Sequence, residues 1–168
     1  MFAVEGVDTL LGHRLDHFGI PPRTTEGLIG ILSGPLLHAN WAHLLANAVP
    51  LFVLLLLLLL DRHYRPGLTL VLIWIASGLG TWLIGRSGEP GRPVIHIGAS
   101  SVIYGLVAYL IVAGFLMKSW RSALISILVL FLYGGIFLGV LPQAGPISWE
   151  GHLSGALAGV WAARRHQA

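Results

Sequence analysis

Five long apolar runs, separated by short polar connectors, constrain this chain more than any other feature. Hydrophobic residues make up 55% of its 168 residues and charged residues only 10%, whereas a soluble domain carries roughly a quarter charged residues. A helix that crosses a bilayer needs about 20 apolar residues. We therefore predict an all-α polytopic membrane protein whose spans lie at about residues 41–60, 67–85, 98–117, 122–141 and 150–165, the last being short for a span.

Charge and cysteine content narrow the class further. The net charge is +3, but the ten Lys and Arg residues stand in ones and twos between the apolar runs, which is typical of the ends of membrane spans. A nucleic-acid partner is therefore not expected. Cysteine is absent from the sequence, which excludes disulfides and thiolate metal sites.

Loop charge predicts the orientation of the spans. The connectors 61–65 and 118–121 and the C-terminal tail each hold a pair of Lys or Arg residues. The positive-inside rule places these segments in the cytoplasm. In a cell (inner) membrane, the N-terminal ends of the first, third and fifth spans would then open on the outer face. His43, Ser100 and His152 would lie on that side at similar depth.

Ser100 and His152 are the main candidates for chemistry. Each begins an apolar stretch inside a glycine-containing string, Gly98-Ala99-Ser100-Ser101 and Gly151-His152-Leu153-Ser154-Gly155. Polar side chains at membrane depth are costly unless they pair, and a serine beside an imidazole is a nucleophile beside its general base. The alternatives are that the small residues only pack helices and that His152 is a proton relay or a ligand.

Spacing supports a close approach of the third and fifth spans. His152, Gly155 and Gly159 lie at i, i+3 and i+7, so they share a helix face, and glycines on such a face allow two backbones to approach. Tyr104 lies one turn after Ser100 and could stack on the imidazole. The alternative for Tyr104 is an ordinary packed aromatic residue with a hydrogen-bonded hydroxyl.

A third group of polar residues lies on the first span. His43 and Asn47 are at i and i+4 and could donate hydrogen bonds to an oxyanion, together with the N–H of Ser100. The alternative is polar contact between helices. His96 is a rival base, but it precedes the third span. Glu150 lies on a different helix face from His152, so a serine hydrolase here would use a dyad without a carboxylate.

These motifs resemble the rhomboid family of intramembrane serine proteases. The matching strings are residues 38–47, 98–105 and 151–155, the last continuing to Gly159. The resemblance implies a rhomboid-like helical bundle that cleaves other membrane proteins within or beside a transmembrane helix, without metal or cofactor. It also implies the site roles: Ser100 as nucleophile, His152 as base, His43, Asn47 and the Ser100 N–H as oxyanion hole, and Tyr104, Gly98 and Gly155 in support.

The chain departs from the family pattern in three places. Ser101 replaces the last glycine of the usual Gly-x-Ser-Gly, and Pro22-Arg23 stands where a Trp-Arg pair is common. The family core has six spans and five are visible, with Met1–Leu11 read as a remnant of the first helix. The expected organisation is an N-terminal remnant and outer loop at 1–27, a membrane domain at 28–165 and a cytoplasmic tail at 166–168.

Two other functions remain open. A catalytically inactive rhomboid-like protein would bind client membrane helices with the same fold. A small transporter or metal channel would use His43, His96 and His152. Transition-metal sites usually recruit carboxylates or thiolates as well, and neither the first nor the third span contains a carboxylate. The metal channel is therefore the less favoured of the two.

Overall fold

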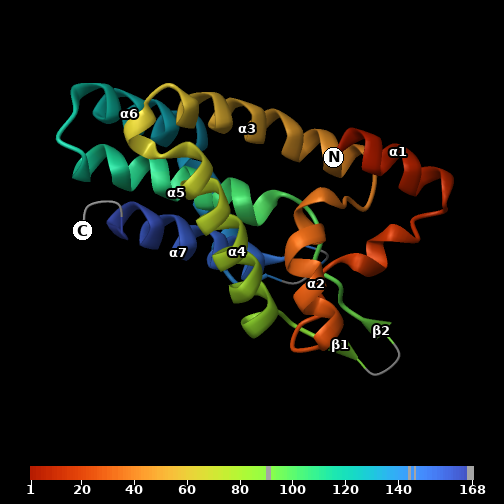
Figure 1. Ribbon diagram of the computed structural model, residues 1–168. Coiled ribbons are helices and arrows are strands. Elements are labelled where there is room, and N and C mark those ends of the chain that lie inside the picture. Colours follow the sequence, from red (N-terminus) through yellow and green to blue (C-terminus); the bar gives the residue numbers. More distant parts are fainter. Residues whose placement is uncertain (90–91, 144, 146, 166–168) are drawn as a thin grey trace.

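The structure is a computed structural model that describes residues 1–89, 92–143, 145 and 147–165. It is a helical bundle with a small hairpin at one end (Figure 1), which confirms the predicted all-α class. The tail at 166–168 lies outside the described residues.

The N-terminal part consists of short elements. Helix α1 (Phe2–Leu10) is followed by the 3-10 turn η1 (Leu15–Phe18), by α2 (Thr25–Ser33) and by the 3-10 turn η2 (Gly34–Leu36). Thr24 caps α2, because its side chain accepts a hydrogen bond from the Gly27 N–H at 3.1 Å. The segment at 27–37 is moderately apolar but is interrupted by Gly30, Gly34 and Pro35. It forms α2 and η2, which are too short together to cross a bilayer as one helix.

The bundle itself is made of five longer helices, joined by tight turns and by the hairpin β1–β2. Their bounds are α3 Trp41–Leu59, η3 Arg62–Tyr64, α4 Pro66–Ile84, β1 Gly88–Glu89, β2 Arg92–Pro93, α5 Ser100–Leu116, α6 Trp120–Tyr133, η4 Gly134–Val140 and α7 Trp149–Arg165.

Helix α5 is the centre of the bundle. It packs against α3, α4, α6 and α7, and Leu106, Val107, Tyr109 and Leu110 are fully buried on it. A helix that is apolar on all sides belongs inside a fold or a membrane. Helix α5 has 17 residues, and Ser100 is the first of them.

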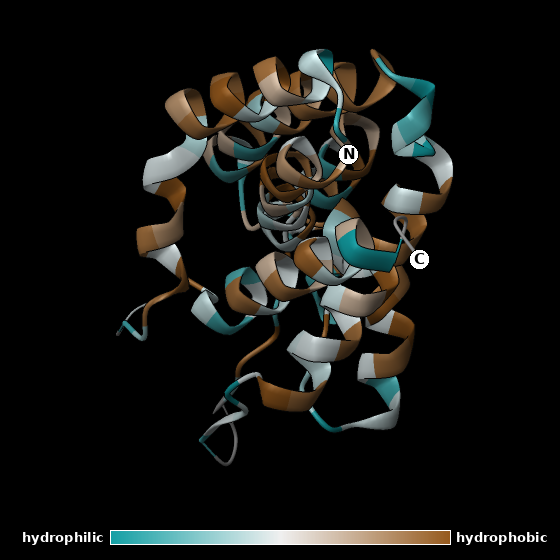
Figure 2. Ribbon diagram, turned by 90° about the vertical axis from the view of Figure 1, so that its left-hand side faces the viewer, coloured by the Kyte–Doolittle hydropathy of each residue, from teal (hydrophilic) through white to brown (hydrophobic). Residues whose placement is uncertain are grey.

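The outer helices present apolar side chains outward. Val49 and Phe52 on α3, Val71 on α4, and Ile127 and Phe131 on α6 are all exposed. In Figure 2 the brown of hydrophobic residues recurs along much of the helical ribbon. Three helical stretches, at Trp41–Leu59, Arg62–Ile84 and Trp120–Val140, are long and apolar enough to cross a membrane. Exposed apolar area of this extent requires a lipid or protein partner, so the chain is a multi-pass membrane protein.

The fourth predicted span differs from a regular helix. The α-helical part ends at Tyr133, and Gly134–Val140 continues as a 3-10 helix. Glycines are poor α-helix formers, and Gly134, Gly135 and Gly139 fall in this segment. A 3-10 helix rises more per residue than an α-helix. The carbonyl groups of this segment therefore point in other directions than those of a continued α-helix would.

The connections alternate between the two ends of the bundle. The 60–63 and 117–122 turns line a common pocket, and the last residues of α7 lie at this same end (Figure 1). The three basic segments of the sequence are therefore at one end, and the first residues of α3, α5 and α7 lie toward the other.

The N-terminal segment is joined to the loop before α5. Ile20 and His96 form an antiparallel bridge, with N–H to O distances of 2.9 and 3.0 Å. Arg23 donates to the carbonyl oxygens of Leu83 and Gly85 at the end of α4, at 2.9 and 2.8 Å. Arg23 thereby satisfies carbonyls that the end of a helix leaves without partners.

Candidate active site

The structure brings Ser100 and His152 together from two helices. Ser100 is the first residue of α5, and His152 lies in the first turn of α7. The distance between Ser100 Oγ and His152 Nε2 is 3.1 Å, which is within hydrogen-bond range. The two residues that the sequence singled out for chemistry therefore have the spacing that proton transfer between nucleophile and base requires.

The imidazole of His152 is held on its other side by backbone and by an aromatic ring. Its Nδ1 lies 3.0 Å from the carbonyl oxygen of Gly139 in η4, so Nδ1 carries the proton and Nε2 is left to accept one. The ring of Tyr104 stacks on it, with centroids 4.0 Å apart and planes inclined by 9°. A backbone carbonyl thus has the place that a carboxylate has in a triad.

Gly139 was given no role by sequence reasoning. A Cβ at this position would stand 2.0 Å from the Tyr104 hydroxyl and 3.3 Å from His152 Nδ1. Only glycine therefore lets the carbonyl of residue 139 reach the imidazole. The sequence offered no local signal for this contact, because it depends on how η4 passes over α7.

His43 and Asn47 lie on the face of α3 that is turned toward Ser100. Both line the same cavity as Ser100 and His152. Asn40 caps α3 by accepting from the His43 N–H at 2.8 Å. One amide hydrogen of Asn47 is used by its own helix, in a bond of 2.8 Å to the His43 carbonyl. The second amide hydrogen and the His43 ring remain as donors.

Gly98 allows His43 to approach the start of α5. Its φ is +106°, in a region that L side chains rarely adopt. A Cβ there would lie 2.8 Å from both Cε1 and Nε2 of His43. The glycine therefore places the imidazole of His43 against the backbone that leads into Ser100. The N–H of Ser100, at the first position of the helix, has no intrahelical acceptor.

These side chains surround one cavity of about 640 Å³. Its polar wall carries the serine, the histidines and Asn47. Its apolar wall comes from α3, α5, η4 and the loops before α5 and α7. The apolar lining residues are Pro50, Val94, Ile95, Ile97, Ile103, Ile136 and Ile147. Polar groups that converge in a largely apolar cavity are the usual form of a binding site.

Two glycines on α7 explain how the helices come close enough. A Cβ at Gly155 would lie 2.0 Å from the Ser101 carbonyl oxygen, and one at Gly159 would lie 2.0 Å from that of Gly105. The backbones of α5 and α7 are therefore in contact along this face. The contact places His152, on the same face, beside Ser100.

His96, the rival base, is engaged elsewhere. Its Nδ1 lies 2.6 Å from Ser148 Oγ and its Nε2 lies 3.1 Å from the Arg86 carbonyl oxygen. Burial lowers the pKa of His96. The imidazole therefore links the loop before α5 to the start of α7, where Ser148 also accepts the Gly151 N–H at 3.2 Å.

Glu150 is turned away from the dyad, as its position on the helix predicted. It is buried, and its Oε1 accepts the backbone N–H of Arg86 at 3.2 Å and lies 3.7 Å from the Arg86 Nε. The Arg86 guanidinium also donates to the carbonyls of Gln143, Gly145 and Ile147. Sequence reasoning missed this junction, which joins the loops on either side of the cavity.

Ser101, at the position where a glycine is usual, is accommodated by α4. Its hydroxyl lies 3.5 Å from Ser77 Oγ.

Within the described part of the chain, the one group of histidines and carboxylates with metal-ligand spacing lies at α1 and η1, away from this cavity.

Comparison with known proteins agrees with the geometry. A family model described as the Rhomboid domain matches residues 25–165. An uncharacterized protein of Mycobacterium tuberculosis is 52% identical over 166 residues, covering 97% of this chain and 69% of the relative. One of Mycobacterium leprae is 45% identical over 167 residues, covering 97% and 66%.

A more distant relative carries the family name. A protein of Acanthamoeba polyphaga mimivirus, named a rhomboid protein, is 32% identical over 138 residues, which cover 81% of this chain and 74% of the relative. No solved structure matches this chain significantly.

Proposed function

Because this chain belongs to the rhomboid family, we propose that it is an intramembrane serine endopeptidase that uses Ser100 and His152 as a catalytic dyad. The observation that carries the proposal is the 3.1 Å separation of Ser100 Oγ and His152 Nε2. A family assignment alone does not establish activity. The paired nucleophile and base are what a protease needs beyond the fold.

The reaction would be acyl transfer in two stages. His152 Nε2 takes the hydroxyl proton of Ser100 as Oγ attacks the carbonyl carbon of a peptide bond. The protonated imidazole then gives its proton to the leaving amine as the carbon–nitrogen bond breaks. Water, deprotonated by His152, hydrolyses the acyl-enzyme and regenerates Ser100. The Gly139 carbonyl and the Tyr104 ring keep the imidazole oriented through both stages.

The negative charge on the attacked carbonyl oxygen would be stabilised from α3 and α5. The N–H of Ser100, the His43 ring and the free amide hydrogen of Asn47 are the donors. Losing one such donor costs about 10²–10³ in rate in soluble serine proteases. Gly98 is essential to this arrangement because a side chain there would displace His43.

The substrates would be transmembrane proteins. The cavity beside Ser100 is lined with isoleucines and Pro50, which suits an apolar segment, and its polar wall can hydrogen-bond a peptide that has locally unwound. With the basic segments in the cytoplasm, the cavity would open near the outer face of the cell membrane. No cofactor is required for this chemistry.

The test is labelling of the detergent-solubilised protein with a fluorophosphonate probe, which reacts with activated serines. We expect the wild type to be labelled and both Ser100→Ala and His152→Ala to lose labelling. Ser101→Ala is the matched control: it removes the adjacent hydroxyl, which contacts Ser77 rather than His152, and labelling should persist.

Cleavage of a model transmembrane substrate by the same variants should follow the labelling. A folded wild type that neither reacts with the probe nor cleaves would reject the protease. The remaining candidate would then be an inactive family member that binds client helices. Labelling that survives Ser100→Ala would mean that another serine is the nucleophile.

A further inference from the structure

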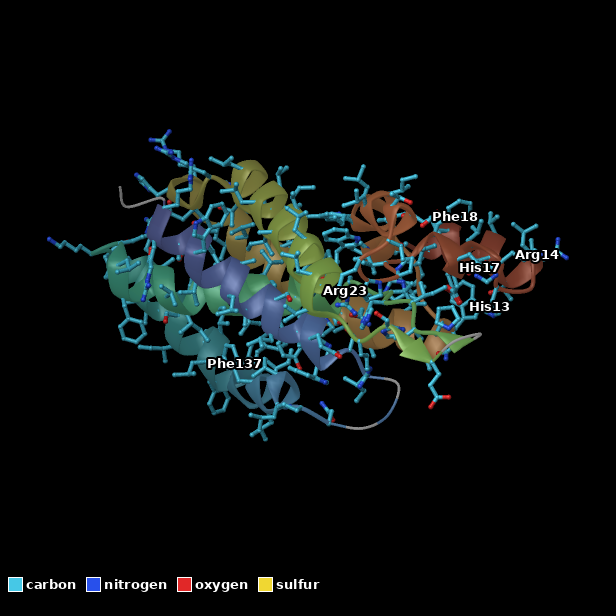
Figure 3. All side chains as sticks on the ribbon, turned by 90° about the horizontal axis from the view of Figure 1, so that it is seen from below. His13, Arg14, His17, Phe18, Arg23 and Phe137 are labelled. Carbon is cyan, nitrogen blue, oxygen red and sulfur yellow. The ribbon has the colours of Figure 1, made fainter. Side chains whose placement is uncertain are left out.

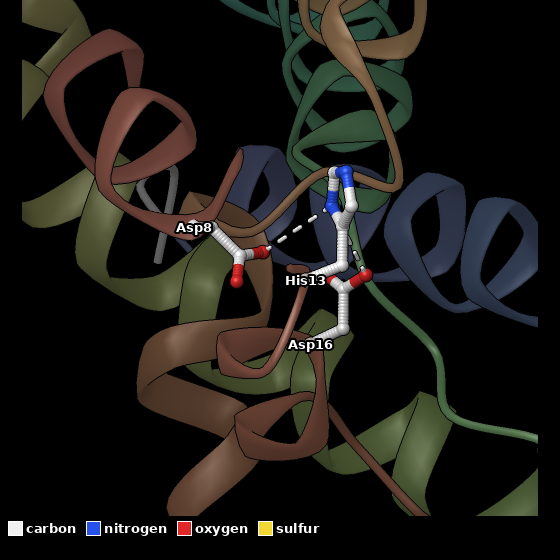
Figure 4. Close-up of side chains that lie close together, drawn as sticks. All are labelled: Asp8, His13 and Asp16. Atoms are coloured by element: carbon white, nitrogen blue, oxygen red, sulfur yellow. Dashed lines mark ion pairs between the residues drawn. The ribbon is translucent and has the colours of Figure 1, made fainter. Parts of the chain in front are cut away.

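We propose that Asp8, His13 and Asp16 form a zinc site that fastens the end of α1 to η1. These residues lie outside the catalytic cavity and have no part in the proposed proteolysis. Figure 4 shows the two carboxylates approaching the imidazole from α1 on one side and η1 on the other.

The distances suit three ligands of one ion. His13 Nδ1 lies 3.7 Å from Asp8 Oδ2 and 4.0 Å from Asp16 Oδ2, and all three ligand atoms lie within 4.8 Å of one another. Ligand atoms around a tetrahedral zinc at about 2.1 Å stand about 3.4 Å apart. To reach that separation, the two distances from His13 Nδ1 would shorten by about 0.3 and 0.6 Å, and the distance between the two carboxylate oxygens by at most about 1.4 Å.

A backbone hydrogen bond to Oδ1 orients the Asp8 carboxylate. Its Oδ1 accepts the Leu15 N–H at 2.7 Å, which leaves Oδ2 directed toward His13. The Asp8 side chain is 1% exposed, and its Oδ2 has no hydrogen-bond partner among the residues that the structure describes. A buried carboxylate oxygen without a partner is costly unless a cation balances it.

The negative charge around these residues also favours a bound cation. Glu5, one turn before Asp8 on α1, is 1% exposed, and its negative charge acts on Asp16. Within the described part of the chain, neither of its carboxylate oxygens has a hydrogen-bond partner. Among the described residues, no lysine or arginine forms an ion pair with Glu5, Asp8 or Asp16. In Figure 3 the Arg14 side chain points out from this end of the molecule.

The donor set selects the metal. One imidazole nitrogen and two carboxylate oxygens suit zinc and other first-row transition ions, whereas calcium and magnesium take oxygen ligands. The fourth position would be held by water or by Glu5. His13 is 41% exposed, which gives the ion a path from solvent.

Metal titration of the whole chain tests the site. The purified protein, free of any histidine tag, would be stripped with chelator and titrated with Zn²⁺ by calorimetry and with Co²⁺ by visible absorption. We expect one ion per chain, a tetrahedral Co²⁺ spectrum and a melting temperature several degrees higher at saturating Zn²⁺. His13→Ala and Asp8→Asn should weaken binding at least about tenfold.

Two variants keep the result interpretable. His17→Ala removes an exposed histidine from the same turn and should bind Zn²⁺ like the wild type. If Asp8→Asn does not fold, Asp16→Asn changes the more exposed carboxylate, at 25% exposure, and should weaken binding likewise.

Three results would overturn the proposal. They are absence of Zn²⁺ and Co²⁺ binding by the folded wild type, binding that the three ligand variants leave unchanged, and stability that depends on pH but not on Zn²⁺. The last would show that protons, rather than a metal ion, neutralise these carboxylates.

Discussion

The orientation of His152 depends on a carbonyl and a ring rather than on a carboxylate. Its Nδ1 bonds to Gly139 in η4, and Tyr104 stacks on its face. Each contact fixes one degree of freedom: the carbonyl selects the tautomer and the ring holds the plane. A dyad built in this way is sensitive to any side chain that separates η4 from α7.

We therefore predict that Gly139→Ala reduces fluorophosphonate labelling and substrate cleavage by about tenfold or more, since misplacement by 1 Å can cost 10²-fold. The added methyl would stand 2.0 Å from the Tyr104 hydroxyl. Gly135→Ala is the control in the same 3-10 helix, because a Cβ there meets nothing within 4 Å. Equal labelling of the two variants would show that the Gly139 contact is dispensable.

We predict that the free energy of unfolding depends on pH because of His38. Its side chain is fully buried, and its ring lies edge-on to that of His43, with centroids 5.1 Å apart. Burial, and next the charge of His43, lowers the pKa of His38 from 6.5 to about 4. Because the folded pKa lies below the unfolded one, the stability that neutral His38 contributes is present above about pH 6.5 and is lost as the pH falls toward 4.

Thermal melts between pH 7 and pH 4.5 measure this effect. The wild type should lose melting temperature on acidification, and His38→Gln should lose less. His17→Gln, which changes an exposed histidine, should follow the wild type. An acid-induced loss that is identical in all three proteins would remove His38 as its cause.

At the level of elements, the contact between α5 and α7 holds the site together. The glycines at 155 and 159 bring the two backbones into direct contact, and α5 is covered on its other sides by α3, α4 and α6. The first turns of two helices thereby meet at Ser100 and His152. Sequence spacing predicted this face of α7 correctly, because i, i+3 and i+7 positions always share one side of a helix.

Gly155→Ala should destabilise the bundle by about 1–3 kcal/mol, the usual cost of overpacking a close contact, and should lower labelling by moving His152. Thermal melts in detergent measure the first effect and the fluorophosphonate probe the second. Gly67→Ala on α4 is the control, since its Cβ meets open space. A Gly155→Ala protein with wild-type stability would show that the helices can separate without loss.

At the level of the whole molecule, the two basic turns and the first residues of α3, α5 and α7 lie toward opposite ends (Figure 1). The turns at 60–63 and 117–122 line one pocket, whereas Ser100, His43 and His152 line another. The positive-inside rule then predicts that the end with the basic turns faces the cytoplasm.

Cysteine labelling tests that direction, because the chain contains no cysteine of its own. His63→Cys in the α3–α4 turn and Glu89→Cys in the hairpin both change exposed residues. In intact cells a membrane-impermeant maleimide should label Glu89→Cys only, and His63→Cys should react after permeabilisation. The reverse pattern would place the cavity on the cytoplasmic side.

The sequence by itself determined that this is an all-helical membrane protein of the rhomboid family and where its main helices lie. Transfer of a helix into a bilayer depends on local composition, so apolar runs and flanking charges suffice to locate α3 to α7. Motif spacing also predicted which residues share a helix face. These properties require no knowledge of how the helices pack.

Only the tertiary structure decided which groups meet. Ser100 and His152 are 52 residues apart, and their separation depends on the rotation and depth of α5 and α7. The Gly139 carbonyl, the His96–Ser148 link and the Asp8–His13–Asp16 cluster join segments whose relative placement no local pattern encodes. Backbone atoms and isolated charged residues leave no periodic signal in a sequence, because their partners are fixed by packing.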